Sequence, residues 1–260
     1  PDNSGTNAGL DFTDNEFLLH GLDTIVGSTV TFEDDFTSDN WTDTTLNMGV
    51  DTGDERLEYK IERHSTNDNT YYDLGSVSDS AWVLRFKLET TTWSVGGGSH
   101  KMAFFGLSAN DNDSWSISGD NIGFLHQVSS NSAERDIHPS FSNGGNYGNG
   151  AQAELSTALA ENQLHYYELI RDGSTYTLSI SDGDDYNGDI ENQSYTLTSG
   201  IQGLQYFVIV NDNTYSISGE VNGYIDDVKF YNGITSVVQG GDSLADKSTN
   251  SVVVNSNLIT

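Results

Sequence analysis

The chain contains no cysteine and only two prolines in 260 residues. Without cysteine there is neither a disulfide framework nor a thiolate metal site, which argues against zinc-finger and thiol redox chemistry. No stretch approaches the roughly 20 consecutive apolar residues that a membrane-spanning helix needs. The sequence therefore predicts a protein that does not insert into a membrane.

Basic residues are also scarce. Ten Lys and Arg stand against 39 Asp and Glu, which gives a formal net charge of −29. The first basic residue is Arg56, and none occurs between Asp172 and Val228. Such a chain cannot neutralise phosphates, so we expect no binding to nucleic acid. An acidic surface of this kind favours divalent cations, or a salty solution that screens the repulsion.

Helical periodicity is nearly absent, and the one helix-like stretch is 151–163, where Leu155 and Leu159 are four residues apart. Elsewhere apolar and polar residues alternate between clusters of Gly, Asn, Asp and Ser, which is typical of an all-β protein. The clearest alternating segments are LEYKIE (57–62), WVLRFKLE (82–89), MAFFGLS (102–108), LHYYELIR (164–171), TYTLSIS (175–181), LQYFVIVN (204–211) and YIDDVKFY (224–231).

The length suits either one large all-β domain or two small ones. Composition favours one compact core at residues 29–234, flanked by an N-terminal arm at 1–28 and a C-terminal arm at 235–260. The C-terminal arm finishes in NSVVVNSNLIT, an uncharged segment of high β-propensity. Such a segment would make a competent edge strand.

Four segments of this core resemble one known superfamily when they are taken together. They are TFEDDFTSDNW (31–41), WVLRFKLE (82–89), LHYYELIRDGSTYTLSISDG (164–183) and GYIDDVKFYNG (223–233). In this combination the chain is similar to the laminin-G-like and concanavalin A-like lectin-glucanase jelly-roll superfamily. The resemblance implies an antiparallel two-sheet jelly-roll sandwich whose first and last strands lie side by side.

The first of these segments raises a question about Asp34. In a strand, alternation places Phe32, Asp34 and Phe36 on one face, so the carboxylate points where the phenylalanines point. A carboxylate aimed at a core is costly unless it is paired, hydrogen-bonded or bound to a metal.

The last strand offers a partner for Asp34. Read without a bulge, YIDDVKFY puts Asp226 on the face of Val228 and Phe230, in the same interior as Asp34. The resemblance implies a structural Ca²⁺ between the two strands, and a hard cation with oxygen ligands suits such a site. In the alternative, the strands are bulged and the acids face water. The predicted ligands are Asp34 and Asp226, with Glu33, Asp35 or Asp227 as further candidates.

No catalytic pattern is recognisable. Glycosidases similar to this superfamily commonly carry their two carboxylates in a Glu-x-Asp-x-x-Glu run, which is absent here. The six histidines form no His-x-His or His-Glu-x-x-His set, and no Gly-x-Ser-x-Gly elbow occurs. We therefore expect a protein that is not an enzyme.

Ligand binding is the more promising reading. Residues 128–150 read as a long loop that contains Tyr147, and Trp93 and Trp115 also lie near loop-like sequence. Exposed aromatic rings stack on sugar faces, so these three residues are predicted to bind a ligand. The alternative is that both tryptophans belong to the core or to a sheet edge.

Three functional readings remain. We expect a non-catalytic, calcium-stabilised extracellular module of a cell-surface protein, which binds glycans or partner proteins in adhesion. Acceptor patterns for glycosylation at Asn40, Asn112 and Asn192 agree with an extracellular location. One alternative is a self-assembling subunit of a surface filament or layer that donates a terminal strand to the next copy. The other is a glycan-active enzyme of unrecognised pattern.

Overall fold

A computed structural model of the chain describes residues 28–43, 48–61, 69–94, 101–111, 119–128, 135–145, 147–155, 159–211 and 220–237. Residues Val30–Ser236 form one compact unit. The two predicted arms fall almost entirely outside the described residues. Within the described part of the chain, no helix is long and apolar enough to cross a membrane.

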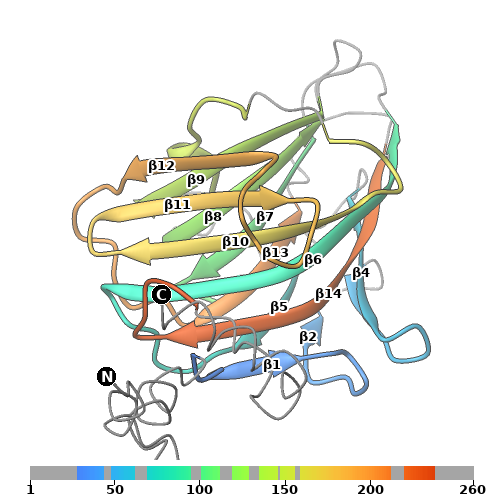
Figure 1. Ribbon diagram of the computed structural model, residues 1–260, viewed down its shortest axis with the longest axis horizontal. Coiled ribbons are helices and arrows are strands. Elements are labelled where there is room, and N and C mark those ends of the chain that lie inside the picture. The colour runs from blue at the N-terminus through green and yellow to red at the C-terminus, as the bar shows by residue number, and fades with distance from the viewer. Residues whose placement is uncertain are drawn as a thin grey trace, which may run out of the picture. The chain divides into compact units, whose positions relative to one another are not determined.

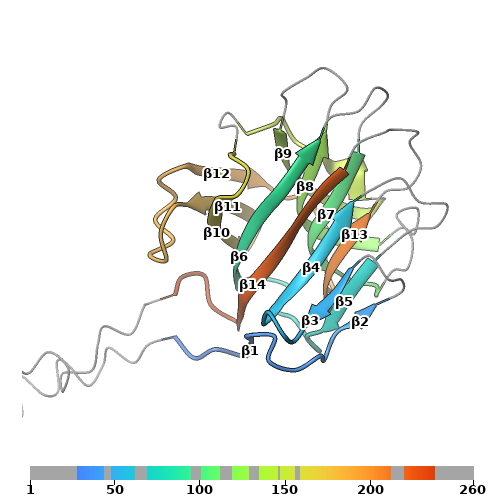
Figure 2. The same ribbon diagram turned by 90° about the vertical axis from the view of Figure 1, so that its right-hand side faces the viewer.

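The larger sheet, sheet A, has the order β12-β11-β10-β6-β14-β4-β3, and β1 also pairs with β14. Figure 2 shows β14 running between β6 and β4. The strands of sheet A are β1 (Phe32–Asp34), β3 (Met48–Asp51), β4 (Arg56–Ile61), β6 (Ala81–Ser94), β10 (Leu164–Asp172), β11 (Thr175–Ser181), β12 (Glu191–Thr196) and β14 (Glu220–Asn232).

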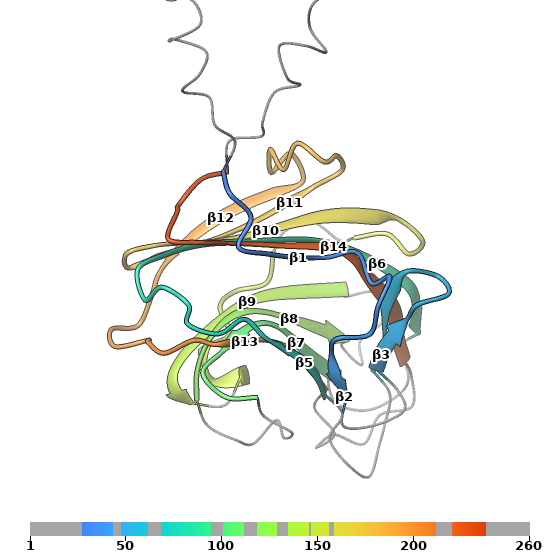
Figure 3. The same ribbon diagram turned by 90° about the horizontal axis from the view of Figure 1, so that it is seen from below.

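The smaller sheet, sheet B, has the order β2-β5-β13-β7-β8-β9 and faces sheet A, as the two layers in Figure 3 show. The paired strands are antiparallel, so the predicted all-β jelly-roll sandwich is confirmed. The elements of this layer are β2 (Thr42–Asp43), β5 (Asn69–Asp73), β7 (Lys101–Ser108), β8 (Gly119–Val128), β9 (Arg135–Gly145), β13 (Tyr206–Asn211) and the 3-10 helix η1 (Tyr147–Gly150).

The core lies between the two sheets and follows the expected alternation. In β6 the side chains of Trp82, Leu84, Phe86 and Leu88 are buried in it. The ring of Phe86 is parallel to that of Tyr167 at a centroid distance of 5.5 Å. Each fully buried large apolar side chain contributes about 1.5–3 kcal/mol to folding. The core positions of β6 thus secure the centre of sheet A.

The first and last strands of the sandwich lie side by side, as the resemblance implied. β1 pairs antiparallel with β14, with Phe32 opposite Phe230 and Asp34 opposite Val228. Figure 1 shows the blue β1 along the orange-red β14. The ring of Phe32 stacks on Tyr72 of sheet B at 4.1 Å, so β1 contacts both sheets.

The reading of β14 as a regular strand is wrong. Its register with β6 shifts between Asp226 and Lys229, and Asp227 has a φ of 51°. A bulge adds one residue and so reverses which side chains face the core. Ile225 and Val228 are therefore both buried, whereas Asp226 lies partly exposed on the outer face. Asp226 and Asp34 do not share an interior.

His126 leads to the first prediction. It lies in the core against Phe105, and complete burial followed by the nearby His165 ring lowers its pKa to about 3. An unfolded histidine has a pKa of about 6.5. Because the unfolded chain binds the proton first, stability is present above this value and is lost as pH falls from about 6.5 towards 3, by up to about 1.4 kcal/mol per pH unit.

Urea unfolding of the wild type and of His126→Leu, measured across this pH range, isolates the effect. The free energy of unfolding of the wild type, measured relative to that of the variant, should fall steadily as the pH is lowered from about 6.5 towards 3. A difference that stays constant with pH would contradict the prediction.

Candidate functional site

Asp34 points inward, as predicted, and its neutralising partners are hydrogen-bond donors from its own segment. The carboxylate is 7% exposed and accepts the backbone N–H of Phe36 at 2.8 Å. It also accepts the indole N–H of Trp41 at 3.0 Å. Phe36 has a φ of 59°, a conformation that is supported by the Asx-type hydrogen bond from its own N–H to Asp34, two residues earlier. Both carboxylate oxygens are thus used within residues 34–41.

The two acids of the last strand lie on the outer face of sheet A instead. Lys87 Nζ is 3.7 Å from Asp226 and 3.4 Å from Asp227, and Lys229 Nζ is 2.8 Å from Asp227. Burial raises the pKa of Asp227, but the ammonium groups of Lys229 and Lys87 outweigh this effect, so the pKa lies below its ordinary value. Ammonium partners therefore already balance this acid pair.

The remaining predicted calcium ligands, Glu33 and Asp35, are exposed. Asp35 accepts hydrogen bonds from the backbone N–H and the hydroxyl of Thr37. A calcium site needs six to eight oxygen atoms directed at one point. Asp34, which points into the core, is separated by the sheet from Asp226 and Asp227 on the outer face. The five residues do not fit a shared calcium ion, and a structural Ca²⁺ stays a prediction.

The three predicted ligand-binding aromatics have different outcomes. The side chain of Trp93 and all of Trp115 lie outside the described residues. Tyr147 is only 1% exposed and stacks on Phe104 at 4.4 Å, so its ring is not an open platform. The predicted loop at 128–150 is itself mostly strand β9 followed by η1, which carries Tyr147. Gly and Asn residues and Pro139 interrupt the alternation of this strand, so its sequence resembles that of a loop.

Tyr147 belongs to a second apolar cluster, on the outer face of sheet B. There Phe104, Leu125, Val208 and Val210 are fully buried beside it. The Phe104 ring lies over a pair of glycines, because a Cβ atom would come within 2.9 Å of its Cζ at Gly106 and within 2.7 Å at Gly123. The missing side chains leave room for this flat aromatic layer.

Two partly exposed tyrosines, Tyr71 and Tyr206, flank this cluster. Their rings are perpendicular, with centroids 5.7 Å apart. Partial burial, followed by the carboxylates of Asp73 and Asp111, raises the pKa of Tyr206. We call Tyr71, Tyr206 and the cluster beneath them the tyrosine face.

The chemistry of the tyrosine face suits a polyhydroxylated ligand. Amphipathic rings that pack on a buried apolar layer offer a rigid surface for a sugar ring. Asp73 opposes Tyr206 in the pairing of β5 with β13 and accepts hydrogen bonds from Gly75 N–H and Gln205 Nε2. The sequence pattern does not single out the two tyrosines as binding residues, because they lie within strands rather than in loop-like segments. The outward positions of Val208 and Val210 were the available signal.

The hydrogen bonds of Asp34 lead to the second prediction. Asp34→Ala leaves the indole N–H of Trp41 and the backbone N–H of Phe36 buried without an acceptor. Each such loss costs about 1–3 kcal/mol. We expect a fall of about 2–4 kcal/mol in the free energy of unfolding in urea, with and without EDTA. The exposed Asp35→Ala is the control and should change stability by less than about 0.5 kcal/mol.

The same experiment tests the calcium prediction. If EDTA destabilises the wild type as much as the Asp34→Ala substitution does, and leaves the variant unchanged, Asp34 is a calcium ligand after all.

No protein-family model and no curated protein sequence matches the chain. Solved structures do match it. A Bacillus subtilis protein of unknown function with a galectin-like fold is 11% identical, with a TM-score of 0.52 over 81% of this chain and 99% of that one. A glycoside hydrolase family 16 endo-glucanase from Bacteroides ovatus is 17% identical, with a TM-score of 0.51 over 77% and 100%. Peanut lectin is 12% identical, with a TM-score of 0.50 over 80% and 97%. At these identities the similarity shows the fold alone: the chain has the two-sheet jelly-roll fold that these solved structures share.

Proposed function

We propose that the chain is a non-catalytic glycan-binding module and that the tyrosine face is its binding surface. The observation that carries the proposal is the perpendicular pair Tyr71 and Tyr206 on the outer face of sheet B. Rigid aromatic anchors with nearby polar groups are the usual source of binding free energy at such surfaces. The fold agrees with this role, since a lectin and a glucanase share it.

The charge of the surface favours a neutral glycan. Asp73 and Asp111 are close enough to Tyr206 to affect its pKa, and the whole chain carries a net charge of −29. An anionic sugar would be repelled by both the local and the total charge. The carboxylates can instead accept hydrogen bonds from sugar hydroxyls.

The centre of sheet B supports a role without catalysis. Hydrolysis of a glycosidic bond requires two carboxyl groups placed across one sugar. The two central strands, β7 (KMAFFGLS) and β13 (YFVIVN), contain no Asp or Glu. The outward positions of β7 are occupied by Phe104, Gly106 and Ser108, which cannot transfer a proton as a carboxyl group does.

An extracellular, cell-surface location with a role in adhesion belongs to the same proposal. Two of the glycosylation acceptor residues, Asn40 and Asn192, are exposed. Glycans that a lectin-like module would bind occur mainly outside cells. The acidic surface also keeps such a module soluble.

Loss of one tyrosine ring tests the proposed surface. Tyr206→Ala should weaken binding to neutral oligosaccharides about tenfold, because an aromatic anchor contributes roughly 1–2 kcal/mol at a binding site. A glycan array identifies the ligand, and isothermal titration calorimetry measures the change. Tyr166→Ala, on the outer face of sheet A, is the matched control. Equal affinity of Tyr206→Ala and the wild type for every bound glycan would rule out the tyrosine face.

Self-assembly is a second candidate function, favoured by the exposed edge of sheet A. Among the described strands β12 pairs only with β11, and its sequence ENQSYT has neither proline nor lysine to block a further strand. The uncharged tail of the chain, outside the described residues, has the composition that a donated strand needs.

Sedimentation of the full chain tests this second candidate. We expect full-length protein to form oligomers whose size grows with concentration, and the deletion of residues 247–260 to leave a folded monomer. A full-length chain that remains monomeric at high concentration, with or without calcium, would exclude assembly.

A further inference from the structure

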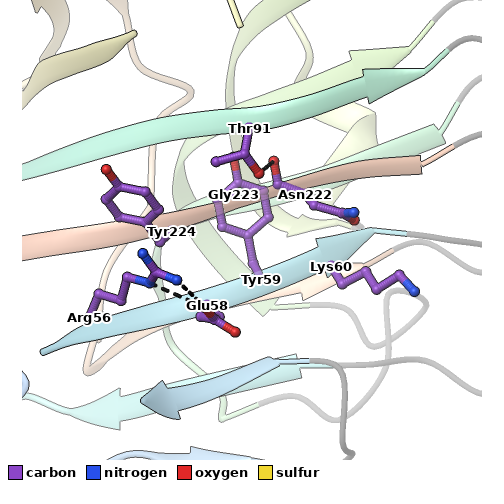
Figure 4. A pocket seen from close by; sticks show the side chains of 8 residues that line it. All are labelled: Arg56, Glu58, Tyr59, Lys60, Thr91, Asn222, Gly223 and Tyr224. Carbon is purple, nitrogen blue, oxygen red and sulfur yellow. Dashed lines mark hydrogen bonds and ion pairs between the residues drawn. The ribbon is translucent and has the colours of Figure 1, made fainter. Parts of the chain in front are cut away.

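The outer face of sheet A carries a hollow of about 270 Å³ between β4, β14 and β6 (Figure 4). It lies on the sheet opposite the tyrosine face, so the two surfaces are separate. Its lining residues are Arg56, Glu58, Tyr59, Lys60, Thr91, Asn222, Gly223 and Tyr224.

One wall of the hollow is held rigidly by charged and aromatic groups. The guanidinium of Arg56 lies 4.8 Å from the centroid of the Tyr224 ring and donates to Glu58 Oε1 at 2.6 Å. The hydroxyl of Tyr224 in turn donates to Glu89 Oε2 at 2.6 Å. These contacts fix the side chains of β4, β14 and β6 relative to one another before any ligand binds.

Gly223 and Tyr59 lie beneath the hollow and are packed tightly from the core side of sheet A. A Cβ atom at position 223 would lie 2.0 Å from the Glu89 carbonyl oxygen and 2.5 Å from the Tyr59 hydroxyl. The Tyr59 side chain, which belongs to the core between the sheets, thus fills the space that a side chain at position 223 would need, and its hydroxyl hydrogen-bonds with Thr90. The register of β14 with β6 also shifts next to Gly223, which changes the local spacing of side chains.

Asn222, on the other wall, carries a buried hydrogen-bond acceptor. Its Oδ1 atom is buried and has no hydrogen-bond partner within the part of the chain that the structure describes. Its backbone carbonyl accepts the hydroxyl of Thr91. A buried acceptor without a donor has an unfavourable free energy. A ligand hydroxyl that donates to Oδ1 would remove this cost and so bind more tightly.

Groups of both charges surround the hollow, and Asp54 also pairs with Arg56, at 3.0 Å. Arg56 and Lys60 line it together with Glu58, and Glu89 adjoins it through Tyr224. A simple anion such as chloride or sulfate would have no hydrogen to donate to Asn222, and any anion would be repelled by the carboxylates of Glu58, Glu89 and Asp54. A divalent cation would be repelled by Arg56. A ligand whose hydroxyl groups both donate and accept fits the whole set.

Access and size agree with a single sugar ring. Elsewhere on this face the connection between β11 and β12 places Tyr186 over Arg85, at 4.3 Å from the ring centroid. At the hollow, by contrast, Arg56, Asn222 and Tyr224 remain partly exposed. Its volume lies just below the range of about 300–1,000 Å³ that is typical of sites for drug-sized ligands.

We propose that this hollow is a second glycan-binding site, which takes one ring of a neutral sugar. Two sites on opposite sheets make the module bivalent, so that it can link two glycan chains or bind one surface with increased avidity. The proposal stands independently of the tyrosine face, because it depends on different strands and different contacts.

NMR titration of the ¹⁵N-labelled full chain with neutral tetrasaccharides of glucose, galactose and mannose tests the proposal. The amide signals of residues 56–60 and 222–224 should shift with at least one of these sugars. Asn222→Ala should weaken this response about tenfold or more. Asn222→Asp, which keeps an acceptor oxygen, should retain more of it. Asn192→Ala, on β12 of the same sheet, should have no effect.

The two sites are read separately in this experiment. In the Tyr206→Ala variant the signals of residues 222–224 should still shift, so failure of the tyrosine face leaves the hollow intact. Two results would overturn the second site. One is the absence of a shift at residues 222–224 with all neutral sugars, and the other is a stronger response to uronate or sulfated counterparts.

Discussion

The pairing of β14 with three other strands is the interaction on which the sandwich depends. β6 lies along one edge of β14, and β4 and β1 share the other edge. Because β1 and β4 come early in the chain and β14 comes last, sheet A is complete only when the two ends of the core meet. Pairings of such high sequence separation make folding slow, since the entropy of closing the loop is lost first.

The bulge in β14 determines which of its side chains point into the core and which lie on the outer face of sheet A. It keeps Val228 and Phe230 in the core after Ile225, and it moves Asp226 and Asp227 to the outer face. There the acids pair with lysines, while Asp34 uses donors from Trp41 and Phe36. Asp34 and Asp226, which would repel each other if both lay in the core, are thus stabilised by different partners. The outer face of sheet A also gains a row of ion pairs beside the hollow.

The general architecture could be predicted because alternation and segment similarity are properties of short stretches. The alternation in WVLRFKLE correctly predicts which of its side chains face the core. The similarity of the segments at 31–41 and 223–233 to the superfamily correctly indicates that the first and last strands are adjacent. The face on which each side chain of β14 lies could not be predicted, because the sequence YIDDVKFY is compatible with a regular strand as well as with a bulged one. The tyrosine face was missed for a similar reason, because Tyr71 and Tyr206 come from distant strands and become neighbours only through the pairing of β5 with β13.

By itself the sequence determined the all-β class, the acidity that disfavours anionic partners, and the inward direction of Asp34, because each follows from composition or from the two-residue period of a strand. The tertiary structure decided the partners of Asp34, the outward position of Asp226, the burial of Tyr147 and the assembly of the hollow. These features depend on register, bulges and contacts between strands that are far apart in the chain. The pattern of residues within a short segment does not predict such contacts.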